Sequence, residues 1–412
     1  MGTLTIALPT TGAAVIMLVA IGIAGFYTHR YLQRRKQDRK LRPPTSNTES
    51  TSLDLTTEDS DVKVIGQDTP PESPVHLHGN YLPISLSTVI GRGRFGAVWK
   101  ADLKFGDDSA ESELPVAVKI FHEMDSGSWS VEKEMFTDEK VMLKHDNVVE
   151  FIAAEVRQGG YDSQRQFWLV TKYYPKGCLY QYLKHHTVSW QEMCRLAGTT
   201  ARGVAHLHAD VYGPHGLHKI PVAHRDLKSS NVLVRDDGTC AIADFGLSIH
   251  LDPTLSIDQL ANSGQAGTPR YMAPEALESK VNLHDIESFK QMDVYSLSLI
   301  VWEIARRCYV GEVVSAEPEH QLPFFDSVPG RASIEDMKTV VALQRERPSI
   351  PAAWHENTGM QLVAATVSDC WDSDPEARLT AHCVEARFIE LITWTEGEQN
   401  PGHNDIHTIT VV

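Results

Sequence analysis

The chain has 412 residues, of which 38 are Lys or Arg and 54 are Asp or Glu, so its formal net charge is -16. Hydrophobic residues make up 42% and charged residues 22%, which is the composition of a folded globular protein. The net acidity argues against nucleic acid as a partner, because phosphate binding needs a surplus of basic side chains. Six cysteines without zinc-site spacing exclude a disulfide-built scaffold, and we expect free thiols in a reducing compartment.

The first expected element is an apolar helix at the N-terminus. Residues 7–28 carry no charge and approach the ~20 residues that a membrane span needs. A basic run over 30–42 follows, which is the order of a stop-transfer signal. We therefore expect a single transmembrane helix, with residues 1–6 outside the cell and the rest of the chain in the cytosol. A cleaved signal peptide is the alternative, since 22–24 read Gly-Ile-Ala, but the basic residues then stand on the wrong side.

A linker separates this helix from the globular part. Residues 29–82 combine the basic run with a stretch rich in Ser, Thr, Pro and acids, which predicts disorder. From residue 83 the pattern becomes globular, and we expect one domain over 83–392. Residues 393–412 form a polar tail.

A glycine-rich loop follows the first strand of that domain. It reads Gly-Arg-Gly-Arg-Phe-Gly-Ala-Val from Gly91 to Val98. Glycines let the backbone approach phosphate oxygens, although such a loop can also open a dinucleotide-binding unit. The Phe and Val favour a hairpin folded over a nucleotide. The residues expected to contact it are Ile90, Gly91, Arg92, Gly93, Arg94, Phe95, Gly96, Ala97 and Val98.

The next strand ends in Val-Ala-Val-Lys119, the position at which a lysine pairs with nucleotide phosphates. A helix expected over 128–143 should present a glutamate to this lysine. Glu132, Glu134 and Glu139 compete for that role. Glu132 is favoured, because it follows Lys119 by 13 residues and lies one turn from an apolar tryptophan.

The most specific signal is a set of short motifs in a fixed order. His-Arg-Asp226-Leu-Lys-Ser-Ser-Asn231 predicts that Asp226 accepts the proton of a substrate hydroxyl and that Asn231 binds magnesium. Asp244, in Asp-Phe-Gly, is the second expected metal ligand, and Ala-Pro-Glu275 follows. Each tripeptide is common by chance. Their joint order and spacing after the glycine loop and Lys119 are not.

With these motifs, residues 83–392 resemble a eukaryotic protein kinase domain. The resemblance implies an α+β fold of two lobes, a β-rich N-lobe over 83–173 and a helical C-lobe over 174–392, with ATP and Mg²⁺ or Mn²⁺ between them. It implies that Thr171 lines the back of the adenine pocket and that the backbone around Tyr173 meets the adenine edge. Lys228 and the Gly-Thr-Pro segment at Thr268 are similar to those of serine/threonine kinases.

The segments 251–267 and 370–380 narrow the resemblance to the type II receptor serine/threonine kinases of the transforming growth factor-β family. This implies a single-pass receptor of the cell membrane that phosphorylates Ser and Thr of a type-1 receptor, and itself, in homo- and hetero-oligomers. An activin-type type-2 receptor is the near alternative. Since that family's cysteine-rich extracellular domain has no counterpart here, ligand binding is not expected, and a ligand-deaf regulatory or scaffold receptor is a further alternative.

Two contacts are expected to brace the C-lobe. Arg378 should pair with Glu275. Asp293 should anchor the backbone of the segment 224–231, called the catalytic loop below. Four histidines precede that loop, and a helix end and an exposed loop explain them better than a metal site does: His206, His208, His215 and His218.

Overall fold

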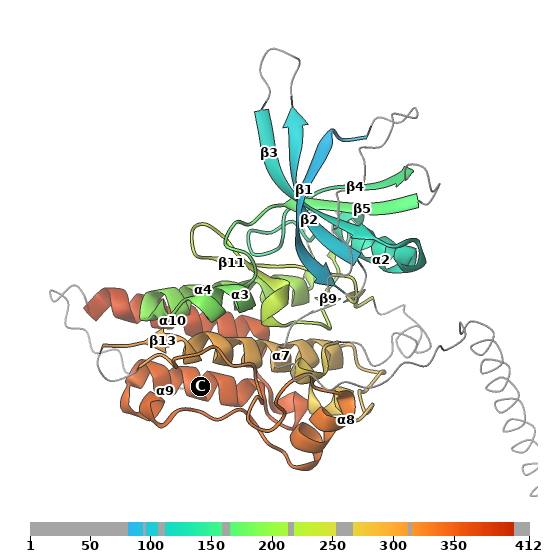
Figure 1. Ribbon diagram of the computed structural model, residues 1–412. Coiled ribbons are helices and arrows are strands. Elements are labelled where there is room, and N and C mark those ends of the chain that lie inside the picture. Colours follow the sequence, from blue (N-terminus) through green and yellow to red (C-terminus); the bar gives the residue numbers. More distant parts are fainter. Residues whose placement is uncertain are drawn as a thin grey trace, which may run out of the picture. The chain divides into compact units, whose positions relative to one another are not determined.

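The structure is a computed structural model that describes residues 81–93, 96–105, 112–158, 165–212, 218–252, 267–311 and 315–398. The expected membrane span, the linker up to residue 80 and the tail after residue 398 lie outside the described residues. Among the residues that are described, no helix is both long and apolar enough to cross a membrane. The described residues belong to one compact unit, and they form two lobes of an α+β fold, a sheet-rich N-lobe and a helical C-lobe (Figure 1).

The N-lobe is a five-stranded antiparallel sheet with the strand order β1-β2-β3-β5-β4. Alternating burial along β1 agrees with the strand expected from the sequence. Buried side chains of the three central strands, among them Trp99, Val118 and Trp168, make its core. The strands are β1 (Ile84–Gly93), β2 (Gly96–Phe105), β3 (Ser112–Phe121), β4 (Phe151–Gln158) and β5 (Arg165–Lys172).

Helix α2 (Ser126–Thr137) packs against this sheet, where Trp129 meets Phe167 with ring centroids 5.3 Å apart (Figure 1). The helix expected over 128–143 is wrong at its C-terminal end, because α2 ends at Thr137. Asp138 is extended, with ψ of 117°, and the chain turns there. Leu143, the last apolar residue of the expected helix, is instead buried in the core of the C-lobe, together with Val141.

The C-lobe is built around α7 (Glu287–Arg306), whose middle is buried on all sides. It lies between α4 (Trp190–His208) and α9 (Thr358–Cys370), and α10 (Ala381–Glu398) packs along α4 (Figure 1). Helix α10 continues six residues past the domain end expected at 392. The shorter helices are α3 (Leu179–His185), α6 (Pro274–Leu277) and α8 (Ile334–Met337), the last followed by a π-helical turn (Lys338–Leu343).

Short two-stranded pairs complete the C-lobe. The hairpin of β10 (Val232–Val234) and β11 (Cys240–Ile242) follows the catalytic loop, and β9 (Val222–Ala223) pairs with β12 (Ile249–His250). The others are β6 (Val188–Ser189), β7 (Val211–Tyr212), β8 (His218–Lys219) and β13 (Cys308–Tyr309). The six cysteines are free thiols, as the sequence predicts.

Candidate active site

Lys119 on β3 lies between two carboxylates. Its Nζ donates to Oε2 of Glu132 on α2 at 2.7 Å and to Oδ1 of Asp244 at 2.6 Å. Burial alone would lower the pKa of Lys119, but the charges of Glu132 and Asp244 outweigh burial and raise it. Lys119 therefore keeps its positive charge at neutral pH, which binding to phosphate requires.

Glu132 is the glutamate of α2 that meets Lys119, whereas Glu134 and Glu139 are exposed. The side chain of Glu132 is 3% exposed, and its second oxygen accepts a hydrogen bond from the backbone N–H of Phe245 at 3.3 Å. Burial raises the pKa of Glu132, and the adjacent Lys119 charge opposes that rise. One carboxylate thus joins α2, β3 and the segment after Asp244.

Three aromatic contacts continue this link across the lobes. The ring of Phe245 lies 5.3 Å from that of Phe136 on α2 and 5.2 Å from that of His224 in the catalytic loop, and Phe136 stacks on Phe151 at 5.0 Å. Sequence reasoning missed Phe136 and Phe151, because nothing in their local sequence distinguishes them from other core residues. The row of rings keeps α2 in register with the catalytic loop.

Asp226 sits at the centre of the catalytic loop. Its Oδ1 accepts hydrogen bonds from both the backbone N–H and the hydroxyl of Thr268, each at 2.7 Å. Its Oδ2 lies 3.1 Å from Nζ of Lys228 and 3.3 Å from the amide nitrogen of Asn231. Lys228 also donates to the Thr268 hydroxyl at 2.8 Å. These contacts hold a carboxylate in place to accept a proton from a hydroxyl group.

The backbone of this loop is anchored from below by Asp293 of α7, as predicted. Its two oxygens accept the N–H groups of His224 at 2.7 Å and Arg225 at 2.8 Å. His208 also contacts Asp293, with Nε2 at 3.0 Å. Arg225 has a φ of +68°, a conformation that is costly for a residue with a Cβ, so these bonds hold a strained turn.

The four histidines before the loop meet different partners. His206 contacts the carbonyl of Met142 at 3.0 Å, and His218 contacts Asp210 at 2.7 Å. His215 lies outside the described residues. Within the described ranges, no group of three or more His, Cys, Asp or Glu side chains is placed to hold a metal ion.

Asn231 and Asp244 have the chemistry of magnesium ligands. Asn231 donates its amide nitrogen to the carbonyl of Asp226 at 2.9 Å, so its amide oxygen is the atom left to bind a cation. Burial would raise the pKa of Asp244, but the charge of Lys119 outweighs burial and lowers it. The side chain of Asp244 is 37% exposed. Magnesium is typically held by one or two such side chains together with substrate phosphates, so this pair fits.

The glycine loop forms the turn between β1 and β2. Arg94 and Phe95 lie outside the described residues. Gly96 has a φ of +154°, and a Cβ there would lie 2.0 Å from the carbonyl oxygen of Ile120. Only glycine fits this site. Ile90 is 47% exposed, as expected for an apolar side chain facing a nucleotide instead of the core.

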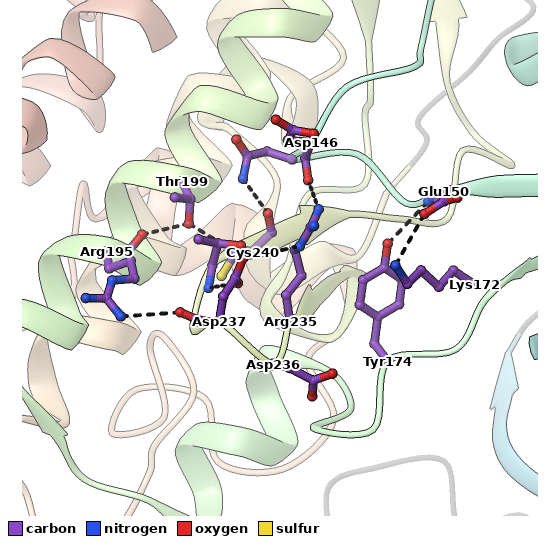
Figure 2. Close-up of polar contacts among 12 residues, drawn as sticks. Asp146, Glu150, Lys172, Tyr174, Arg195, Thr199, Arg235, Asp236, Asp237 and Cys240 are labelled. Atoms are coloured by element: carbon purple, nitrogen blue, oxygen red, sulfur yellow. Dashed lines mark hydrogen bonds and ion pairs between the residues drawn. The ribbon is translucent and has the colours of Figure 1, made fainter. Parts of the chain in front are cut away.

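Thr171 on β5 leads into the connection between the lobes. Glu150 braces this connection through contacts with Lys172 and Tyr174 (Figure 2). The Tyr174 hydroxyl accepts the backbone N–H of Glu150 at 3.3 Å, and Lys172 pairs with the Glu150 carboxylate at 3.4 Å. Arg235, which directly follows β10, donates to the carbonyl of Asp146. Tyr173 sits on this braced segment, and Lys100 Nζ lies 5.2 Å from the centre of its ring.

Comparison with known proteins agrees with this arrangement. Residues 84–388 match the family model described as protein tyrosine and serine/threonine kinase. The chain is 44% identical over 390 residues to TGF-beta receptor type-2 of Mus musculus, and the match covers 93% of this chain and 65% of that protein. The chain belongs to the TGF-beta receptor type-2 family of protein kinases.

Other receptors are also similar. TGF-beta receptor type-2 of Gallus gallus is 51% identical over 311 residues, covering 75% of this chain and 54% of that receptor. Activin receptor type-2A of Xenopus laevis is 42% identical over 330 residues, covering 80% of this chain and 61% of that receptor. The predicted resemblance to type II receptor kinases is thus confirmed. The chain spans between about half and two thirds of the length of these relatives.

Proposed function

We propose that this chain is a receptor serine/threonine kinase that transfers the γ-phosphate of ATP to a type-1 receptor of the transforming growth factor-β family and to itself. The observation that carries the proposal is the placement of Lys119 between Glu132 and Asp244, with Asp226 and Asn231 beside them. A chain that served only as a scaffold would not need this set of charges, and so the alternative of a non-catalytic receptor has less support.

Each residue then has a role in phosphoryl transfer. Lys119 binds the α- and β-phosphates, and Glu132 fixes the direction of its ammonium group. Asp226 accepts the proton of the substrate hydroxyl as that oxygen bonds to the γ-phosphorus and the bond to the leaving ADP oxygen breaks. Lys228 stabilises the negative charge on the transferred group. Asn231 and Asp244 would hold Mg²⁺ or Mn²⁺, which would supply charge neutralisation at the phosphates.

Preference for Ser and Thr is supported by Lys228 and Thr268. Lys228 donates to the Thr268 hydroxyl at 2.8 Å, and both side chains also contact the Asp226 carboxylate. Ile90, the glycine loop over 91–98, Thr171 and Tyr173 are proposed to enclose the nucleotide, within a kinase domain over 83–392.

The membrane arrangement is proposed from sequence and relatives. Residues 7–28 would span the cell membrane once, with 1–6 outside and the basic run 30–42 holding the kinase domain in the cytosol. Protease added to intact cells should then leave the kinase domain whole. Digestion from outside would contradict this topology without affecting the proposed chemistry.

The substrate proposal is tested by incubating the full chain with the juxtamembrane Ser/Thr segment of a type-1 receptor and ATP. We expect phosphoserine and phosphothreonine in that segment and in the chain itself. If the chain phosphorylates itself and leaves the type-1 segment unmodified, the kinase assignment stands and the substrate is wrong.

A further inference from the structure

Glu303 of α7 is a fully buried carboxylate that lies directly below the catalytic loop. Its exposed fraction is 0%, and three side chains donate hydrogen bonds to it. Oε2 accepts from the Ser229 hydroxyl at 2.8 Å and from Nε2 of His320 at 2.9 Å, and Oε1 accepts from the Tyr271 hydroxyl at 2.7 Å. A carboxylate can be buried at this depth only when hydrogen bonds replace its water, so the donors are essential to this arrangement.

Two of these donors lie in the segments that carry the candidate catalytic residues. Ser229 lies in the turn Ser229–Asn231, directly after Lys228, and so precedes the metal ligand. Tyr271 lies in the turn Pro269–Tyr271, which follows Thr268. Their hydroxyls are 3.2 Å apart. Burial and the charge of Glu303 raise the pKa of Tyr271, so its phenol stays a donor. Glu303 thus joins the catalytic loop to the segment that runs from Asp244 to Glu275, here called the activation segment.

His320 is the third donor, and it comes from a different part of the chain, the loop over 315–333 between α7 and α8. Its side chain is 3% exposed, and its ring packs edge-on against Tyr180 of α3 with centroids 5.2 Å apart. The serine hydroxyl can rotate, and both the serine and the tyrosine hydroxyl can donate to another acceptor, as their 3.2 Å contact allows. An imidazole N–H held by a packed ring has one direction only. His320 therefore fixes the position of the Glu303 carboxylate, and this carboxylate in turn positions the Ser229 and Tyr271 hydroxyls.

The same loop grips the activation segment at a second place. Arg270 is 4% exposed, and it donates to the carbonyls of Pro323 at 2.7 Å and Val328 at 3.0 Å. Arg270, which is next to Tyr271, and Glu303 are thus both bonded to the loop over 315–333. A shift of that loop would be passed to the surface on which a peptide substrate lies beside Asp226.

We propose that His320 is a positioning residue for phosphoryl transfer, which acts through Glu303 to hold Ser229 of the catalytic loop and Tyr271 of the activation segment in their working places. This inference rests on the proposed kinase function. It assigns the 315–333 loop a part in how a peptide substrate is presented to Asp226, separate from nucleotide binding by Lys119 on the opposite lobe.

The test compares three variants of the full chain in steady-state assays with a Ser/Thr peptide and ATP. His320→Phe keeps a ring against Tyr180 and removes the donor, and His320→Gln keeps a donor of similar reach. His382→Phe, on the exposed surface of α10, is the matched control. We expect His320→Phe to lower kcat/KM for peptide about ten-fold, as the loss of one hydrogen bond to a charged group would. The KM for ATP should not change, and His320→Gln should restore kcat/KM to within about two-fold.

The outcomes separate this inference from the function on which it rests. An inactive parent chain refutes the proposed function itself. An active parent with an equally active His320→Phe variant overturns the role of His320. The role is also overturned if His320→Gln is as impaired as His320→Phe, or if the KM for ATP rises as much as that for peptide, because a general loss of structure then explains the effect.

Discussion

The pairing of Arg378 with Glu275, predicted from the sequence and confirmed by the structure, allows its contribution to stability to be worked out. Nη1 and Nη2 of Arg378 donate to the two Glu275 oxygens at 2.7 and 2.8 Å. The guanidinium also donates to the carbonyls of Asp372 at 2.9 Å and Gln291 at 3.0 Å. The Arg378 side chain is 0% exposed and that of Glu275 is 12% exposed, so little water is available to replace these bonds.

Arg378→Met keeps an unbranched chain of similar bulk and removes all four hydrogen bonds. Glu275 is left as an unpaired carboxylate with little solvent, a change that typically costs about 3–5 kcal/mol. We expect the free energy of unfolding, measured in urea, to fall by that amount. Adding Glu275→Gln should recover part of the loss, because the double variant no longer buries an uncompensated charge.

Arg387 provides the matched control. Its Nη1 lies 2.8 Å from Oδ2 of Asp369, but the two side chains are 28% and 45% exposed. Surface pairs of this kind contribute up to about 1 kcal/mol, so Arg387→Met should change stability by no more than that. Equal losses for Arg378→Met and Arg387→Met would refute the argument from burial.

Three further predictions concern packing, pH and catalysis. Gly203→Ala should destabilise the chain by about 1–3 kcal/mol in calorimetry, because the added Cβ would lie 2.6 Å from the Asn147 carbonyl oxygen. Gly127→Ala is the control, since a Cβ there meets nothing within 4 Å, and it should be neutral or stabilising. Burial and the neighbouring His145 lower the pKa of His206 to about 4. The stability that comes with neutral His206 is therefore present above about pH 6.5 and should be lost as the pH falls toward 4. A series of urea titrations in which His206→Gln shows the same slope of unfolding free energy against pH would contradict this. Lys119→Met should abolish phosphate transfer measured with labelled ATP, because it removes the ammonium group that Glu132 orients toward the phosphates.

The candidate catalytic residues could be located from the sequence because they lie in short motifs. Asp226, Asn231 and Asp244 each sit in a tripeptide or octapeptide whose spacing is set by local backbone geometry. Glu132 was separable from Glu134 because residues two apart on a helix face different sides, and only one of them can meet Lys119.

Contacts between distant segments were not predictable in the same way. Glu303, His320 and Tyr271 come together only because α7, the following loop and the activation segment pack on one another, and no local pattern records this. The range of α2 was overextended for a related reason. Val141 and Leu143 are buried, as helix residues of that pattern would be, but in a loop that packs onto the C-lobe.

The proposed role of Asp226 as the base of a serine/threonine kinase can be tested by labelled phosphate transfer with the full chain. The parent chain should yield phosphoserine and phosphothreonine, and Asp226→Asn should yield neither. Asp236→Asn, in which the changed carboxylate is on the exposed β10–β11 turn, should match the parent (Figure 2). Undiminished transfer by Asp226→Asn, or phosphotyrosine as the main product, would contradict the account.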